Sequence, residues 1–150
     1  MNRLWKWIIS VSFCLLLIAL LAGYGIRFNR SNSLKQMIFI SASIKSPLVK
    51  EQIVSFDHPN LQATLGKILI GFPGDQISIR DQMVFVNDRE IGLYKTASSS
   101  GKTYSPISQE IVPEGHYFVY TPHPESFDSR YEEFGLIEGS WIKEVLWPLF

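Results

Sequence analysis

The distribution of apolar residues divides the chain into two unlike parts. Residues 7–26 form a run of 20 residues without a charge, and about 20 apolar residues span a bilayer core as a helix. Trp7 at one end and Tyr24 at the other suit the membrane–water interface. Residues 1–28 are therefore predicted to be an N-terminal membrane anchor, and residues 29–150 a separate domain.

A cleaved secretory signal is the alternative interpretation of this run. The apolar core of such a signal is usually about 7–15 residues long, which is shorter than residues 7–26, and no clean small-x-small cleavage site follows them. We therefore favour an uncleaved anchor. Positive charges flank both ends of the run, so the positive-inside rule leaves its orientation open.

After residue 30 the pattern is that of short strands. Apolar or alternating runs occur at residues 37–44, 52–56, 67–72, 76–79, 83–86, 89–94, 109–112, 116–121 and 141–147. Turn residues such as Asp57-His-Pro-Asn60, Pro73-Gly-Asp75 and Pro113-Glu-Gly115 separate these runs, and no convincing amphipathic helix interrupts them. The predicted fold class is mainly β: one transmembrane helix followed by a compact antiparallel β domain.

Charge and cysteine content narrow the classes of function. Lys plus Arg equals Asp plus Glu at 14 each, and a neutral balance argues against a nucleic-acid partner. The single cysteine, Cys14, lies in the apolar run, so the rest of the chain can form no internal disulfide. His58, His116 and His123 have no metal-ligand spacing, and we expect neither a metal site nor a catalytic histidine.

Lys67 is unusual because it heads an apolar run, Lys-Ile-Leu-Ile-Gly-Phe-Pro-Gly-Asp, that ends at Asp75. A charged lysine among apolar residues is costly to bury, and burial lowers its pKa so that it can act as a base. Ile68, Leu69 and Ile70 are candidates for the apolar surroundings. Taken alone, however, the pattern also fits a lysine that protects an edge strand from aggregation.

Two further blocks carry hydroxyl and charged side chains. Ser31-Asn-Ser33 follows the apolar run, and Ser126-Phe-Asp-Ser-Arg130 lies near the C-terminal end. Alone, the first block is typical of a linker and the second of a surface loop. Asp128 and Arg130 can form an ion pair that stiffens this loop.

The three blocks, in this order after a membrane span, resemble the type I signal peptidases, which are membrane-anchored Ser–Lys endopeptidases. The short domain and the amino-acid sequence of residues 122–131 are most similar to those of the conjugative-transfer, TraF-type branch. The resemblance implies the signal-peptidase β fold, no cofactor, and a single-pass protein of the bacterial inner membrane. Its catalytic domain is expected on the periplasmic or extracytoplasmic side, with membrane lipid and a secreted or pilin precursor as partners.

The resemblance also implies a role for individual residues. Ser33 matches the nucleophile and Lys67 the general base that deprotonates it. The main-chain amide of Ser33 and the hydroxyl of Ser31 match the oxyanion hole. Ser126 matches the serine that orients the lysine, and Asp128 with Arg130 matches a structural ion pair.

Some positions depart from the family pattern. Lys35 and Met37 stand where the TraF-type branch usually has proline and glycine, and Glu51-Gln52 replaces a Gly-Asp pair. Thr121-Pro-His123 replaces the Gly-Asp-Asn of the general signal peptidases. These departures concern the substrate side more than the Ser–Lys pair, and they leave an inactive member as an alternative.

The favoured interpretation is a serine endopeptidase that cleaves the leader of a secreted or pilin precursor, with pilin cyclisation as a further step in the TraF-type branch. The alternative is a catalytically inactive, membrane-tethered β domain that binds a secretion or conjugation partner. A self-cleaving Ser–Lys regulator is a third class, against which the membrane span and the absence of a DNA-binding region argue.

Substrate and membrane contacts follow from the same resemblance. An extended substrate is expected to add as a strand beside the residues before Ser33 and before Lys67, with shallow pockets for small side chains. Trp141, Trp147 and the terminal Leu149-Phe150 either contact the lipid interface or belong to the core.

Overall fold

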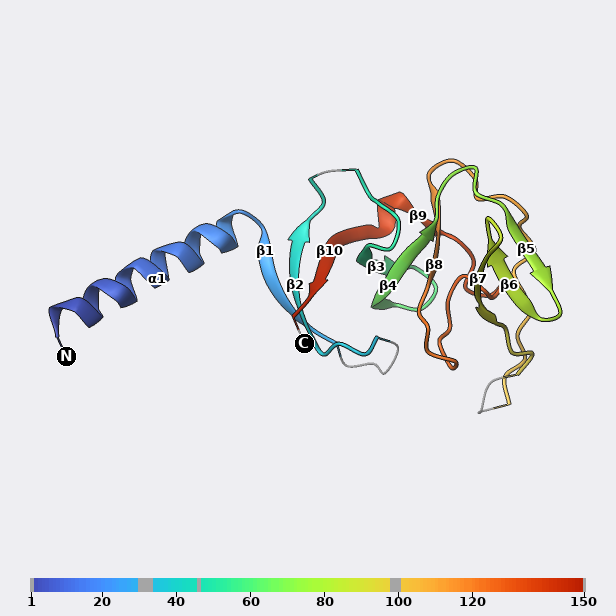
Figure 1. Ribbon diagram of the computed structural model, residues 1–150, viewed down its shortest axis with the longest axis horizontal. Coiled ribbons are helices and arrows are strands. Elements are labelled where there is room, and N and C mark those ends of the chain that lie inside the picture. Colours follow the sequence, from blue (N-terminus) through green and yellow to red (C-terminus); the bar gives the residue numbers. More distant parts are fainter. Residues whose placement is uncertain (1, 30–33, 46, 98–100, 150) are drawn as a thin grey trace.

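The computed structural model describes residues 2–29, 34–45, 47–97 and 101–149. Ser31 and Ser33 lie outside these described residues. An apolar helix projects away from a β-rich body, and a small second sheet lies at the end of the body opposite to this helix (Figure 1). The predicted fold class, mainly antiparallel β with an apolar N-terminal helix, is confirmed.

The helix α1 (Arg3–Leu21) has no buried residue and is long and apolar enough to cross a membrane. It begins four residues before the predicted run 7–26 and ends five residues before the end of that run. At its C-terminus, the Lys45 ammonium donates a hydrogen bond of 2.7 Å to the carbonyl of Ala22. Gly23 then takes a φ of 85°, which glycine tolerates best, and the chain continues as a strand rather than as helix.

Ten strands follow within the described residues. They are β1 (Tyr24–Phe28), β2 (Ile38–Ser43), β3 (Ile53–His58), β4 (Ala63–Gly71), β5 (Ile77–Arg80), β6 (Met83–Val86), β7 (Arg89–Leu93), β8 (His116–Tyr120), β9 (Ile137–Glu138) and β10 (Ile142–Pro148), with a 3₁₀ turn η1 (Gly139–Trp141) before β10. One sheet has seven strands in the order β1-β2-β10-β3-β4-β8-β9, and the other has the order β5-β6-β7. The neighbouring strands pair antiparallel.

Five segments differ from the sequence prediction. β1 and β9 were not predicted as strands, and β1 lies within residues 1–28. β4 begins at Ala63 rather than at Lys67, because its exposed first residues pair with β3 through their backbone and show no apolar pattern. Residues 109–112 make one isolated bridge to Gln76 instead of a strand. His58, predicted to lie in a turn, ends β3 and is 2% exposed.

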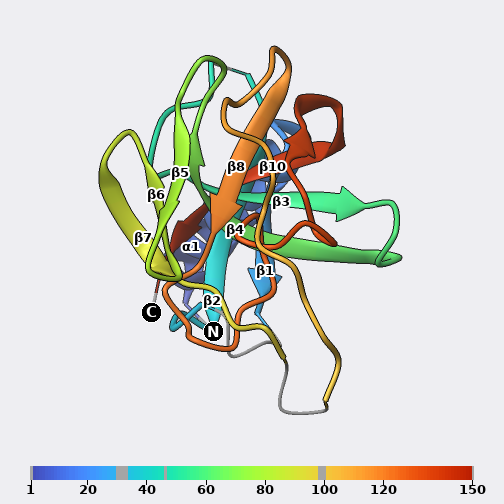
Figure 2. The same ribbon diagram turned by 90° about the vertical axis from the view of Figure 1, so that its right-hand side faces the viewer.

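Two apolar clusters lie on opposite sides of β4 and β8, because successive side chains of a strand point to opposite faces. One cluster consists of Val54, Phe56, Leu69, Val119, Tyr131, Phe134, Ile137 and Ile142. The other packs the small sheet against these strands and consists of Ile70, Ile77, Val84, Val86, Ile91, Ile107, Val112 and Phe118. In Figure 2 the small sheet accordingly lies to one side of β8, whereas β3 and β4 extend to the other.

The two C-terminal tryptophans have different surroundings. Trp141 packs against the first cluster, with its ring centroid 5.5 Å from that of the buried His58, so it belongs to the edge of the core. Trp147, on β10, is 47% exposed, and Leu149 is 43% exposed. Trp147 and Leu149 are thus available for contact with lipid, and Phe150 lies outside the described residues.

Candidate active site

Lys67 lies in the middle of β4, opposite Val54 of β3, and only 3% of it is exposed. Leu69, two residues along the same face, is fully buried, whereas Ile70 points into the other cluster. Burial lowers the pKa of Lys67 to about 8, because the charged form loses its hydration. This burial excludes the interpretation of Lys67 as an exposed edge-strand lysine.

The hydrogen-bond partner of Lys67 is Ser126, as the family resemblance implies. The Lys67 Nζ donates to Ser126 Oγ at 2.6 Å, and both groups are buried. The hydroxyl of Thr121 also donates to Ser126 Oγ, at 2.6 Å. Both lone pairs of the Ser126 oxygen are therefore engaged, so its position is set from two sides.

Sequence reasoning missed Thr121, which was noted only as a departure from the family pattern. It follows β8, is fully buried, and its backbone amide donates to Asp128 Oδ2 at 3.2 Å. A hydroxyl residue directly after a buried strand was the signal available in the sequence. Its function could not be read there, because it depends on the fold of residues 121–126.

Asp128 and Arg130 form the predicted ion pair, and this pair is buried. Arg130 Nε donates to Asp128 Oδ1 at 2.8 Å and Nη2 donates to Oδ2 at 2.9 Å. Burial by itself lowers the pKa of Arg130, but the hydrogen bond and charge of Asp128 outweigh it, so the pKa is raised. On Lys67 the pair has opposing effects, since Asp128 raises its pKa and Arg130 lowers it.

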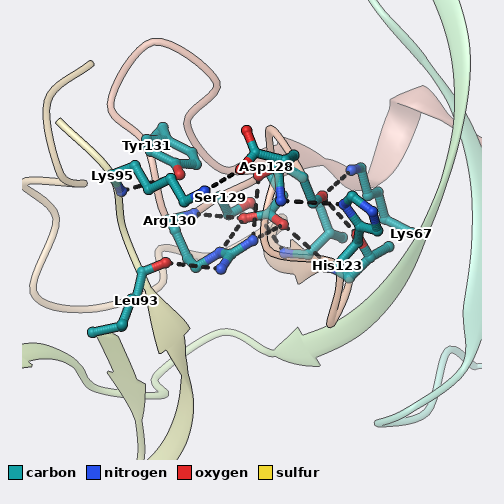
Figure 3. A network of polar contacts seen from close by, with 12 residues as sticks. Lys67, Leu93, Lys95, His123, Asp128, Ser129, Arg130 and Tyr131 are labelled. Carbon is teal, nitrogen blue, oxygen red and sulfur yellow. Dashed lines mark hydrogen bonds and ion pairs between the residues drawn. The ribbon is translucent and has the colours of Figure 1, made fainter. Parts of the chain in front are cut away.

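Arg130 also joins the lysine site to the small sheet. Its Nη2 donates to the Ser126 carbonyl at 3.2 Å, and its Nη1 donates to the Leu93 carbonyl at the end of β7 at 2.9 Å. A Cβ at Gly92 would lie 3.0 Å from this Nη1, so glycine allows the close approach. Figure 3 shows Arg130 and Asp128 between Leu93 on one side and Lys67 on the other.

Asn29 ties together the two sides of the segment that contains Ser31 and Ser33. Its side-chain amide donates to the carbonyls of Leu34 and Gln36 at 3.0 Å each, and its backbone amide donates to Met37 at 2.9 Å. The positions of Ser31 and Ser33 themselves lie outside the described residues. The sequence pattern does not mark Asn29, because hydrogen bonds to residues five to eight positions away leave no periodic signal.

A groove of about 470 Å³ opens beside Lys67. Its floor includes Leu34, Phe39 and Leu146, which form a small buried cluster of their own. The full lining is Arg27, Phe28, Asn29, Leu34, Phe39, Ser55, Thr64, Leu65, Gly66, Lys67 and Leu146. The chain neighbour of Ser33, Leu34, therefore lines the same groove as the buried lysine.

The departures from the family pattern have different structural consequences. Lys35 and Met37 are exposed, so neither side chain fills the core near the groove. Glu51 has a φ of 66°, the left-handed conformation that glycine favours, and this explains why glycine is usual at that position. The carboxylate of Glu51 forms an exposed ion pair with Arg89.

The three histidines occupy separate environments. His58 donates from Nε2 to the Phe134 carbonyl at 3.1 Å. His116 Nδ1 contacts the Glu114 carbonyl, and His123 Nδ1 accepts from the amide of Glu125. In the described part of the chain, no group of three His, Cys, Asp or Glu side chains is arranged to hold a metal.

Residues 3–144 match a protein family described as “Signal peptidase, peptidase S26”. Two proteins called “Conjugal transfer protein TraF” are similar to this chain. The one from Agrobacterium fabrum is 29% identical over 93 residues, which are 61% of this chain and 52% of that protein. The one from Agrobacterium tumefaciens is 30% identical over 90 residues, 59% of this chain and 49% of that protein. The chain thus spans about half the length of these curated relatives.

General signal peptidases are similar as well. A protein called “Signal peptidase I” from Rickettsia canadensis is 37% identical over 79 residues, which are 48% of this chain and 29% of that protein. The crystal structure of a signal peptidase I from Enterococcus faecalis superimposes with a TM-score of 0.49 at 30% identity, covering 70% of this chain and all of that one (100%).

Proposed function

Because the chain belongs to the signal peptidase S26 family, we propose that it is a membrane-anchored serine endopeptidase that uses a Ser33–Lys67 dyad. The observation that carries this proposal is the buried Lys67, whose pKa burial lowers to about 8 and whose amine is held by Ser126. A structural lysine has no need of such surroundings, whereas a general base works best with a pKa near the working pH.

The position of Leu34 supports Ser33 as the nucleophile. Leu34 lines the groove into which the Lys67 site opens, and consecutive Cα atoms are only about 3.8 Å apart. Asn29 anchors both flanks of residues 30–33 through its hydrogen bonds to Leu34 and Met37.

The proposed mechanism follows from these groups. Neutral Lys67 takes the proton of the Ser33 hydroxyl, and the Ser33 oxygen attacks the carbonyl carbon of the scissile peptide bond. The amide of Ser33 and the hydroxyl of Ser31 donate to the oxyanion. The Lys67 ammonium then gives its proton to the leaving amine, and water hydrolyses the acyl-enzyme.

An extended substrate segment fits the free edge of β4. β8 pairs with β4 only from Ile68 onward, and β3 covers its other edge. Residues 63–67 therefore have one edge without a strand partner among the described strands. A peptide can add there as a further strand, with its scissile bond near Lys67.

The substrate class follows from the relatives. Similarity to proteins named for conjugal transfer supports a precursor used in conjugation, such as a pilin with a leader segment. If an amine of the same pilin replaced water in the second step, the acyl-enzyme would be resolved by cyclisation. We place the anchor in the bacterial inner membrane and the β domain on its periplasmic or extracytoplasmic side.

An exposed apolar face supports a site at the membrane surface. Ile26 of β1, Ile40 of β2 and Trp147 of β10 are register partners across three strands. Ile26 is 59% exposed and Phe28, also on β1, is 70% exposed. Because β1 directly follows the membrane helix, this face lies where the lipid interface begins.

Precursor processing in membranes tests the proposal. Ser33→Ala and Lys67→Ala are each expected to lower the rate of processing by at least about 10²-fold, whereas Lys143→Ala, at an exposed lysine, leaves it unchanged. If both variants process the precursor as well as the wild type, the peptidase proposal fails in favour of the alternative, a catalytically inactive, membrane-tethered β domain that binds a secretion or conjugation partner.

A further inference from the structure

The groove beside Lys67 has a second charged group, Arg27. Its guanidinium forms a bidentate ion pair with the Glu144 carboxylate, in which Nε donates to Oε2 at 2.9 Å and Nη2 donates to Oε1 at 2.7 Å. The two residues are 117 positions apart in the sequence and lie on β1 and β10. Neither takes part in the proposed cleavage mechanism.

Glu144 is the more buried member of its ion pair with Arg27. The Glu144 side chain is 16% exposed, whereas that of Arg27 is 57% exposed. Two buried serines, Ser41 and Ser55, also donate to the carboxylate, at 3.3 and 3.5 Å. The carboxylate is thus occupied by partners within the protein, and the guanidinium is the member of the pair that a peptide in the groove can reach.

Arg27 points into the groove and not toward the apolar face. In β1 the side chains of Ile26 and Arg27 point to opposite faces of the sheet, because side chains alternate along a strand, and of these two only Arg27 lines the groove. Its register partner is Phe39, which lies in the apolar floor of the groove. Arg27 is therefore a charged donor beside the apolar part of the groove, which Leu34, Phe39 and Leu146 form.

A guanidinium can only donate hydrogen bonds and stays charged at all relevant pH values. A carboxylate oxygen is its best partner, a neutral carbonyl or hydroxyl oxygen is weaker, and an ammonium or second guanidinium is repelled. We propose that Arg27, held by Glu144, determines which peptides bind: the groove selects a segment with an aspartate or glutamate facing Arg27 and disfavours lysine or arginine there.

This inference rests on the proposed peptidase function and adds the chemical class of one substrate position. A further substrate side chain on the same side of the extended peptide meets Leu34, Phe39 and Leu146 and is therefore expected to be apolar. Since Arg27 is more than half exposed, solvent screens its charge. We expect aspartate to be preferred over lysine by about fivefold at that position, which corresponds to roughly 1 kcal/mol.

The test uses the full-length protein in detergent micelles and a set of internally quenched decapeptides. One position at a time carries Asp, Asn, Ala or Lys, and cleavage sites are mapped by mass spectrometry. Arg27→Gln should abolish the preference for Asp over Lys at one position, and Arg27→Lys, which keeps the charge, should retain most of it. Arg80→Gln is the matched control, because Arg80 is also 57% exposed and ion-paired but lies in the small sheet.

Binding of the same peptides, measured by fluorescence anisotropy with the Lys67→Ala variant, separates the two claims. Cleavage by the wild type with no preference that depends on Arg27 overturns the inference and leaves the peptidase function intact. Absence of cleavage, combined with tighter binding of Asp peptides that Arg27→Gln removes, overturns the peptidase function and supports the preference of the groove. Absence of both cleavage and selective binding overturns both.

Discussion

Two cations line the same groove, and their surroundings are opposite. Lys67 is 3% exposed and its closest partner is a neutral hydroxyl, so burial lowers its pKa to about 8. Arg27 is largely exposed and forms an ion pair with the Glu144 carboxylate, and the hydrogen bond to this carboxylate raises the pKa of Arg27. The partner and the burial of each cation therefore decide whether it can exchange a proton or serves as a fixed charge.

The Asp128–Arg130 pair maintains this difference. Asp128 would by itself stabilise a charged Lys67, just as Glu144 stabilises Arg27, but Arg130 compensates its charge. The pair thus supplies rigidity near Lys67 while adding little net charge. Substitutions around Lys67 and around Arg27 test how strongly the two environments differ.

Removal of Arg130 should have the largest effect. Arg130→Met leaves the Asp128 carboxylate buried without a counter-charge, and breaking a buried pair in this way costs about 3–5 kcal/mol. Chemical denaturation of the full-length chain measures this loss, with Arg80→Met at an exposed pair expected to cost less than about 1 kcal/mol. Equal losses in the two variants would contradict a buried, structural role of Arg130.

The stability of the protein should depend on pH through Lys67. The folded chain releases the Lys67 proton near pH 8, whereas the unfolded chain keeps it to about 10.5. Between these values the unfolded state binds more protons, so the free energy of unfolding rises with pH, by about 3 kcal/mol in total. Below pH 8 the folded state carries the full cost of the buried charge.

Lys67→Met provides the comparison for this pH dependence. The variant lacks the titrating group, so the rise between pH 8 and 10.5 should disappear when its unfolding free energy is compared with that of the wild type. Denaturant titrations at a series of pH values give both curves. Parallel curves would show that Lys67 is not held in an environment that favours its neutral form.

Thr121→Val should have a moderate effect on activity. Without the Thr121 hydroxyl, Ser126 is less firmly placed, and a lost buried hydrogen bond of roughly 1 kcal/mol corresponds to about a fivefold lower kcat/KM. With the Thr121 donor removed, the Ser126 oxygen accepts a stronger hydrogen bond from the charged form of Lys67, which raises the pKa of Lys67. The midpoint of the pH–rate profile should therefore move to higher pH.

Thr121→Ser keeps the donor and should restore both the rate and the midpoint of the profile. An unchanged pH–rate profile in Thr121→Val would contradict a role of Thr121 in positioning Ser126. A loss in Thr121→Ser as large as that in Thr121→Val would instead assign the effect to packing of the methyl group.

Glu144→Gln should have the smallest effect. It removes one charge of a pair whose arginine is exposed, so the free energy of unfolding should change by no more than about 1 kcal/mol. The midpoint of the pH–rate profile should stay where it is, because Arg27 remains charged. A shift of that midpoint would show that the Arg27–Glu144 pair and Lys67 are electrostatically coupled.

Much of the fold could be predicted from the sequence, because the signals are local. The apolar run required a helix, and the alternating runs between turn residues located nearly all the strands. The prediction was inaccurate where backbone hydrogen bonding determines the element. β1 begins inside the apolar run 7–26, and residues 109–112 make a single bridge instead of a strand. His58 was assigned to a turn because a proline follows it, although it ends a buried strand.

The lysine site was predicted in part. The family resemblance implied that Ser126 lies beside Lys67 and that Asp128 and Arg130 support this site, and the structure brings these four residues together. The assignments of Ser31 and Ser33 remain predictions. Thr121 could not be identified as part of the site because no pattern in the sequence distinguishes a hydroxyl that donates to another side chain from one that faces solvent.

By itself the sequence determined the apolar N-terminal helix, the β class and the residue types available for a Ser–Lys site, because hydrophobic period and turn chemistry act over a few residues. Only the tertiary structure decided which charges stay charged. Lys67 meets Ser126 across 59 positions and Arg27 meets Glu144 across 117. Whether a cation meets a hydroxyl or a carboxylate there depends on strand order and register, which long-range packing sets.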